Sequence, residues 1–193
     1  SNESLSAPDI QINFTPGTHQ RGMQSTLENQ AGFTMATWQH RPESYGYVRA
    51  RSQDPFKHPE IQPNYLAADT DQQVILAAIK TCRKLAQTEA LRPFIVNETF
   101  PGAACQNDDE LLNSAREIGQ SIYHLMGTCR MGNRDDKTAV VDSELRVHGI
   151  KNLRVIDASI MPTMVSANLN AAVMMIAEKG ADMVLGKLSA KPH

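Results

Sequence analysis

The chain has 193 residues, of which 41% are hydrophobic and 21% are charged, and its formal net charge is −2. This length predicts one domain or one and a half, and the balance of apolar and charged residues excludes a disordered tail and a membrane protein. The basic residues are scattered along the chain, so the sequence lacks the charge pattern of a nucleic-acid-binding protein.

The first part of the chain has the patterns of β-structure. Residues 9–14 alternate between polar and apolar side chains, and residues 31–38 and 44–49 are rich in Phe, Tyr, Thr and Val. We therefore predict strands in these three segments. The prolines between residues 54 and 64 indicate an extended, irregular path across the surface.

Two helices are predicted in the middle of the chain. Thr70 and Gln73 have the spacing of a capping box, and apolar residues then recur every three or four positions as far as Ala86. Asn107 and Glu110 have the same spacing ahead of a second apolar repeat that ends near Gly119.

The last part of the chain combines short strands with one helix. Apolar runs at residues 139–141, 145–147 and 153–156 predict three short strands, and an apolar repeat after Pro162 predicts a helix in which Gly180 leaves room for a close neighbour. The fold class is therefore α+β, with an antiparallel sheet and covering helices followed by a C-terminal strand–helix unit.

The cysteines indicate the redox environment of the protein, and the N-terminus indicates how the chain was obtained. Cys82, Cys105 and Cys129 are odd in number and form no CxxC pair, which argues against a disulfide framework or a zinc knuckle and favours a reducing compartment. The start has no signal-peptide pattern, and we interpret residues 1–3 as a tag remnant. We expect the chain to be part of a longer protein.

Common catalytic signatures such as GxSxG, GxxxxGK[ST], HExxH and GxGxxG are absent. The first candidate for chemistry is instead residues 123–132, in which a histidine precedes two glycines of a close-held loop. One interpretation is a glycine-rich turn with a structural histidine. The alternative is a soft-metal site, which the tight spacing and the lack of a second histidine disfavour. Its ligands would be His124, Met126, Cys129 and Met131.

The second candidate is the segment from Arg154 to Asn170. A predicted strand leads here into Asp157, small residues and the start of the last helix. Unpaired N–H groups and the positive end of the helix dipole favour an anion or an electron-rich ring edge. The alternative is that Ser166 or Asn168 is simply the N-cap of the helix.

Several motifs recur in an order that resembles the C-terminal region of the glucose-methanol-choline (GMC) flavin oxidoreductases. The resemblance is strong over residues 120–188, and residues 54–65 also resemble the substrate-domain segment of that family. The stretches that carry it are His124 with 127–132, 141–149, 153–163 and 168–179.

The resemblance implies roles for individual residues. His124 matches the active-site histidine near the flavin, and Asn168 matches the second active-site position, which is His or Asn among members. Asp157 and Ala158 match the segment that lies against the FAD, and Asn168 with Leu169 matches the helix start that faces the flavin ring. An asparagine at position 168 matches the choline-type branch.

These implied roles agree with the chemistry of alcohol oxidation. His124 would accept the hydroxyl proton, and Asn168 would hydrogen-bond the developing alkoxide while the FAD takes the hydride. Tyr123 would offer an aromatic face to a quaternary ammonium substrate, unless it lies in a strand and points into the core. Arg130 and Arg146 could meet a phosphate or a carboxylate, but solvated or structural ion pairs are the more common role of such arginines. We interpret His148 as structural.

The family resemblance also implies an organisation for the whole protein. Residues 4–119 would be the substrate-binding region and residues 120–193 the active-site and FAD-contacting segment. FAD would be held mainly by an N-terminal FAD domain of the same protein, which contains the GxGxxG motif. The substrate would be a small-molecule primary alcohol, oxidised to an aldehyde, whereas nothing in the sequence indicates the electron acceptor.

We expect the chain by itself to be inactive and to self-associate through the apolar face that would pack on the FAD domain. The expected location is cytoplasmic, with any membrane association arising through the full-length enzyme. The alternative to an enzyme is a non-catalytic module that binds a ligand or partner and derives from the same substrate domain.

Overall fold

The computed structural model describes residues 1–187 except 3, 21–22 and 167, without the side chains of 23–25. Glu3 of the predicted tag remnant and residues 188–193 of the predicted C-terminal segment lie outside the described residues. The chain divides into two compact units, one formed by residues 1–46 and 62–121 and the other by residues 47–61 and 122–193. Each unit is described below by itself.

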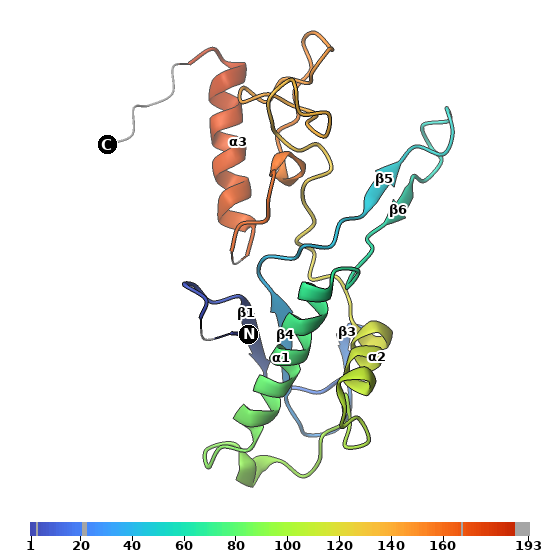
Figure 1. Ribbon diagram of the computed structural model, residues 1–193, viewed down its shortest axis with the longest axis vertical. Helices are drawn as coiled ribbons and strands as arrows, with labels where there is room; N and C mark the ends of the chain where they lie inside the picture. Colours follow the sequence, from blue (N-terminus) through green and yellow to red (C-terminus); the bar gives the residue numbers. More distant parts are fainter. Residues whose placement is uncertain (3, 21–22, 167, 188–193) are drawn as a thin grey trace. The chain divides into compact units, whose positions relative to one another are not determined.

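The first unit contains two small antiparallel sheets and two helices (Figure 1). Strand β1 (Ile10–Thr15) pairs with β4 (Thr34–Gln39) from Ile10 opposite Gln39 to Thr15 opposite Thr34. A second pair joins β2 (His19–Gln20) to β3 (Met23–Leu27). The predictions of strands at 9–14 and 31–38 are thus confirmed, although β4 begins three residues later than predicted.

Helix α1 (Asp69–Ala86) packs against β4, and its apolar face meets α2 (Asp108–Ile118). The core between the helices contains Leu76, Leu111 and Leu112. The predicted capping box of α2 is confirmed, because Asn107 Oδ1 accepts from the Glu110 amide at 2.9 Å while the Glu110 carboxylate accepts from the Asn107 amide. This arrangement satisfies amides that the helix itself leaves unpaired.

The predicted capping box of α1 is wrong. The N-cap is Ala68, which has no side-chain acceptor, and the helix starts at Asp69, one residue before the predicted Thr70. The amides of Ala67 and Ala68, just before the helix, donate to Ser44 Oγ instead. The side chain of Asp71, in the first turn, is 2% exposed. It accepts hydrogen bonds from the amides of Glu43 and Ser44 and from Gln39 Nε2, and so ties the loop after β4 to the first turn of α1.

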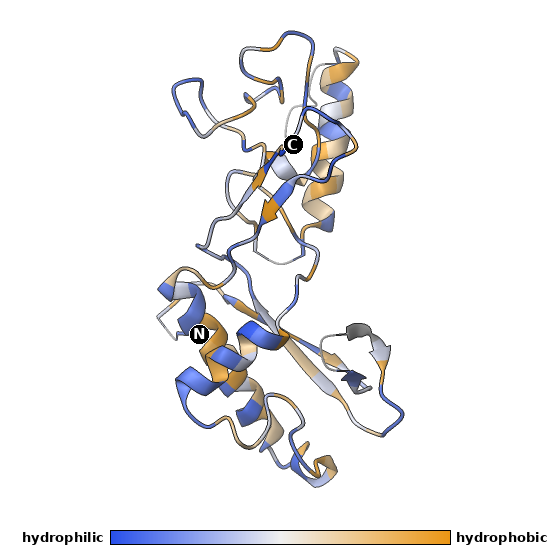
Figure 2. Ribbon diagram, turned by 90° about the vertical axis from the view of Figure 1, so that its right-hand side faces the viewer, coloured by the Kyte–Doolittle hydropathy of each residue, from blue (hydrophilic) through white to orange (hydrophobic). Residues whose placement is uncertain are grey.

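The second unit contains β5 (Tyr47–Arg49), which pairs with β6 (Glu60–Gln62), and helix α3 (Asn170–Val184). Strand β6 lies in the segment for which we predicted only an irregular path. Two short 3₁₀ helices also occur among the described residues, η1 (Arg92–Phe94) in the first unit and η2 (Ala158–Ile160) in the second. Figure 2 shows apolar residues along α3, interrupted by polar positions.

The core of the second unit is formed mainly by turns that pack on α3. Its buried side chains are those of Val141, Leu145, Ile160, Met161, Leu169 and Ile176. Gly180 is buried as predicted, and a Cβ atom there would lie 2.3 Å from Cγ2 of Ile156. Only a glycine lets the helix come this close to the chain.

The three short strands predicted between residues 139 and 156 are not regular strands. Isolated bridges take their place, and they pair Met131 with Val141, Val141 with Val147, and Arg146 with Arg154. Two tight turns interrupt any longer pairing. In these turns Leu145 donates back to Asp142, and Ile150 donates back to Val147. The broader expectation of α+β structure with antiparallel sheets and helices is confirmed.

Candidate functional site

The loop that contains His124 is held against the segment that follows Arg154. The amide of Cys129 donates to the carbonyl of Ser159 at 2.9 Å, and the amide of Met131 donates to that of Ile160 at 2.7 Å. A longer contact of 3.4 Å joins the Gly127 amide to the Ala158 carbonyl. The two candidate regions of the sequence, about 30 residues apart, are therefore adjacent along this line of hydrogen bonds.

The two glycines of the loop are needed for different reasons. Gly127 has a φ of +85°, in the left-handed region that residues with a Cβ atom rarely adopt. At Gly132 there is no room for a side chain, because a Cβ atom there would lie 2.9 Å from Cβ of Ala139. The interpretation of residues 123–132 as a close-held glycine-rich loop is consistent with both features.

His124 lies half-buried in this loop between two exposed residues, Tyr123 and Leu125. Tyr123 is 82% exposed and has a φ of +62°, so it belongs neither to a strand nor to the core. The core alternative for Tyr123 is therefore wrong. A bulky residue with this backbone conformation is uncommon and marks a sharp change of chain direction immediately before His124.

Asp157 and Ala158 form the turn that leads into η2. The Asp157 carboxylate accepts a hydrogen bond from the amide of Ser159 at 2.7 Å and so caps the 3₁₀ helix from its own side chain. Asp157 is exposed and Ala158 is half-buried. This turn presents one carboxylate and one backbone carbonyl beside the loop of His124.

Helix α3 begins at Asn170, and its N-cap is Leu169 rather than Ser166 or Asn168. No described side chain caps this helix, because leucine lacks an acceptor and the side chain of Leu169 is buried in the core, with 3% exposed. The N–H groups of the first turn are therefore not satisfied by a capping side chain. Asn168 is exposed one residue before the cap.

One core supports all these segments. Met126 and Met131 of the loop pack against the cluster that contains Leu169 and Ile160. Met126 and Met131 are two of the four ligands of the alternative soft-metal site, and both side chains are packed against this core. Among the described residues, no group of three or more His, Cys, Asp or Glu side chains could hold a metal ion.

The other polar residues singled out in the sequence have structural contacts. Arg146 Nε lies 2.9 Å from Asp142 Oδ2, and His148 Nε2 lies 3.1 Å from the carbonyl oxygen of Gly132. Hydrogen bonds from Thr138 lower the pKa of the Asp136 carboxyl, and the charge of Arg130 lowers it further.

Sequence reasoning missed two features. The role of Asp71 was missed because its partners lie in a distant loop, and the one local signal is its place in the first turn of a helix, where acidic residues are common. The second feature is a group of basic side chains on the turns of residues 131–154. Its members are scattered along the sequence and are brought together by the turns.

With this geometry established, comparison with known proteins identifies the family. The family model described as GMC oxidoreductase matches residues 42–177, which is more than half of the chain. The chain belongs to the GMC oxidoreductase family.

Individual relatives agree with this assignment. The chain is 44% identical over 181 residues to mitochondrial choline dehydrogenase from Homo sapiens, covering 93% of this chain and 30% of that protein. The structure is similar to that of pyridoxine 4-oxidase from Mesorbium loti, with a TM-score of 0.79 and 27% identity, covering 94% of this chain and 35% of the other.

An FAD-dependent oxidoreductase from Chaetomium thermophilum is also similar, with a TM-score of 0.73 and 29% identity, covering 80% of this chain and 27% of the other. The chain thus spans about a third of the length of the relatives that it matches. No helix among the described residues combines the length and the apolar character that a membrane crossing requires.

Proposed function

We propose that this chain is the C-terminal part of an FAD-dependent alcohol dehydrogenase of the choline type, which oxidises a primary alcohol to an aldehyde. The observation that carries the proposal is the hydrogen-bonded contact of the His124 loop with the segment 158–160. It supports the proposal because it holds the loop that contains His124 beside the turn of Ala158, the two segments matched to the family's active site and FAD contact. The identity to a choline dehydrogenase supports the substrate class.

The residues described here fit a flavin. Helix α3 starts without a side-chain cap, so the N–H groups of its first turn can stabilise negative charge on an electron-rich ring. Asp157, Ala158, Asn168 and Leu169 are the residues that would contact the cofactor. FAD, when bound, accepts the hydrogen and the electron pair that leave the alcohol carbon. The N-terminal part of the same protein would hold the rest of the FAD.

His124 acts as the base in this proposal. A neutral imidazole accepts the hydroxyl proton of the alcohol, which allows electron density to build on the oxygen as the C–H bond breaks. His124 is half-buried, so its ring is only partly shielded from water. Asn168 donates a hydrogen bond from its amide to the developing alkoxide and holds the alcohol in place.

Tyr123 is proposed to contribute to selection of a cationic alcohol. Its ring is exposed next to His124, and the face of a tyrosine attracts a quaternary ammonium group by a cation–π contact of about 0.5–2 kcal/mol. A cationic substrate held there would have its hydroxyl group near the base.

The test is the visible absorption spectrum of the intact protein, purified without added cofactor. We expect the spectrum of oxidised flavin and its loss when choline is added without oxygen. Trimethylamine, which lacks the hydroxyl group, should leave the spectrum unchanged, and benzyl alcohol should bleach it far more slowly. A colourless intact protein would contradict the proposal and favour a non-catalytic binding module. Bleaching by benzyl alcohol alone would refute the choline-type assignment.

A further inference from the structure

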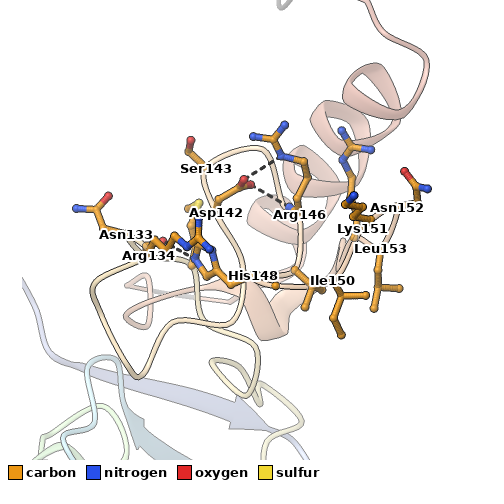
Figure 3. A pocket seen from close by; sticks show the side chains of 15 residues that line it. Asn133, Arg134, Asp142, Ser143, Arg146, His148, Ile150, Lys151, Asn152 and Leu153 are labelled. Carbon is orange, nitrogen blue, oxygen red and sulfur yellow. Dashed lines mark hydrogen bonds and ion pairs between the residues drawn. The ribbon is translucent and has the colours of Figure 1, made fainter.

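An open pocket lies on the turns of the second unit, and its lining contains neither His124 nor Asn168. It has a volume of about 890 Å³ and is lined by residues 131–134, 142–143 and 146–154. Figure 3 shows these side chains gathered around the turns, with α3 behind them. The pocket is large enough for a ligand of the size that proteins usually bind in such sites.

The lining of this pocket is strongly basic. It contains four arginine or lysine side chains and one carboxylate, that of Asp142, in a chain whose net charge is −2. The four cationic residues are Arg134, Arg146, Lys151 and Arg154.

Arg146 is already neutralised within the protein. Its Nε lies 2.9 Å from Asp142 and its Nη1 lies 3.1 Å from Glu144. Figure 3 shows the contact between Asp142 and Arg146. Burial alone would raise the pKa of Asp142, but the amide and side chain of Arg146 and the amide of Glu144 hold it below its ordinary value. Two acidic residues near the pocket, Asp142 and Glu144, are therefore both engaged by this arginine. A third, Asp136, lies next to Gly132 of the lining, and its carboxylate accepts hydrogen bonds from Thr138.

The other three cations have no acidic partner. Arg134, Lys151 and Arg154 form no ion pair with any residue that the structure describes. The Nε of Arg154 donates to the carbonyl oxygen of Glu144 at 3.1 Å, which fixes the direction of this guanidinium. These three cations line one open pocket, so an anion bound in the pocket would be attracted to each of them.

Neutral groups in the lining suit an anion as well. Ser143, Asn133 and Asn152 can each donate a hydrogen bond from the pocket wall. The lining of the pocket also contains two exposed apolar side chains. Ile150 is 55% exposed and Leu153 is 46% exposed, on either side of Lys151 and Asn152 in the sequence. A ligand with a charged oxyanion group and an apolar part would match both features.

We propose that this pocket binds the phosphate group of an anionic ligand. A phosphate carries several oxygen acceptors and up to two charges, which fits three cations and neutral donors better than a single carboxylate does. The phosphate could belong to a soluble compound or to a lipid headgroup. The chemistry of recognition is the same in both cases, and it is independent of the proposed alcohol oxidation.

The experiment measures binding of inorganic pyrophosphate to the intact protein by calorimetry, and flotation with phosphatidylcholine vesicles with and without phosphatidic acid. The test variant combines Arg134→Gln, Lys151→Gln and Arg154→Gln. The control combines Lys57→Gln, Lys84→Gln and Lys137→Gln, three exposed residues outside the pocket that remove the same charge. We expect the test variant to weaken binding by at least about tenfold, and the control to stay within about twofold.

Saturable binding of pyrophosphate that the test variant loses assigns the site to soluble phosphates. Flotation that requires phosphatidic acid and is lost in the test variant, without pyrophosphate binding, assigns it to a lipid headgroup. Both support the phosphate site, and both should weaken as salt is added. Failure of both probes to bind, or an equal loss in the control variant, overturns the proposal. Circular dichroism of each variant checks that it is folded.

Discussion

The amide of Cys129 donates a hydrogen bond to the carbonyl oxygen of Ser159 at 2.9 Å. This contact, with the neighbouring one from Met131 to Ile160, fixes the loop of His124 beside the turn of Asp157. Main-chain hydrogen bonds therefore hold together the two segments that contain the proposed catalytic base and the proposed FAD contact. Side-chain substitutions at His124 should therefore change reactivity without moving the loop.

His124→Ala should lower turnover of the alcohol by about 10²–10⁴-fold in the intact protein, with the flavin retained, because a general base contributes that factor. The measurement is steady-state turnover per bound flavin. His58→Ala is the matched control, since His58 is exposed in the segment between β5 and β6. Turnover near that of the unaltered protein would remove His124 from the mechanism.

Asn168→Ala should slow turnover by about 10–10³-fold, because the alkoxide loses one hydrogen-bond donor in the transition state. The rate of flavin reduction at saturating alcohol measures this effect. Asn97→Ala, at another exposed asparagine, should leave the rate unchanged. If flavin content falls while the rate per flavin holds, Asn168 supports cofactor binding instead.

Tyr123→Ala should raise KM for choline by about 2–30-fold, which corresponds to the loss of a cation–π contact. An uncharged primary alcohol should show no such change, and Tyr123→Phe should restore the KM for choline because the ring is kept. Comparison of the two KM values isolates the contribution of the ring. An equal rise for the charged and the uncharged alcohol would contradict the proposed contact.

Asp71→Asn should destabilise the chain by about 2–4 kcal/mol at neutral pH, since the carboxylate accepts three hydrogen bonds in a buried site. Both oxygens of Asp71 accept from N–H groups, so the side-chain NH₂ of the asparagine would point at a donor of the main chain or of Gln39 and could not accept its hydrogen bond. Urea denaturation measures the loss. Asp69→Asn, at an exposed residue in the same turn, should have little effect.

The contribution of Asp71 depends on pH. Burial would raise the pKa of this carboxyl, but the hydrogen bonds from Glu43, Ser44 and Gln39 outweigh it, so the pKa in the folded state lies below the ordinary value. Its stabilising effect is therefore complete above the pKa of the unfolded chain and is lost as the pH falls through the folded value. The gap between the unaltered protein and Asp71→Asn should narrow in acid, and a constant gap would refute this account.

Gly180→Ala should destabilise the second unit by about 1–3 kcal/mol, because the added methyl group would overlap with Ile156. Thermal unfolding measures the change, and Glu178→Ala on an exposed position of the same helix serves as control. Adding Ile156→Ala to Gly180→Ala should recover part of the loss relative to the sum of the single variants. Strict additivity of the two changes would argue against a direct clash.

The sequence by itself determined the helices, the two strands that pair first in the chain and the order of the family motifs, whereas the pairing itself came from the structure. The apolar repeat in residues 75–86 and the capping box of Asn107 and Glu110 predict helices correctly because both depend on residues within one or two turns. The motifs around His124 and Asn168 indicated the family, which the comparisons established.

Only the tertiary structure decided which distant groups meet. Asp71 was predicted merely as part of a helix, yet its carboxylate accepts a hydrogen bond from Gln39, 32 residues away. The runs between 139 and 156 have the composition of strands, but tight turns reduce them to single bridges. The basic pocket likewise arises from the folding of residues 131–154, because pairings between residues far apart depend on the path of the chain and not on local pattern.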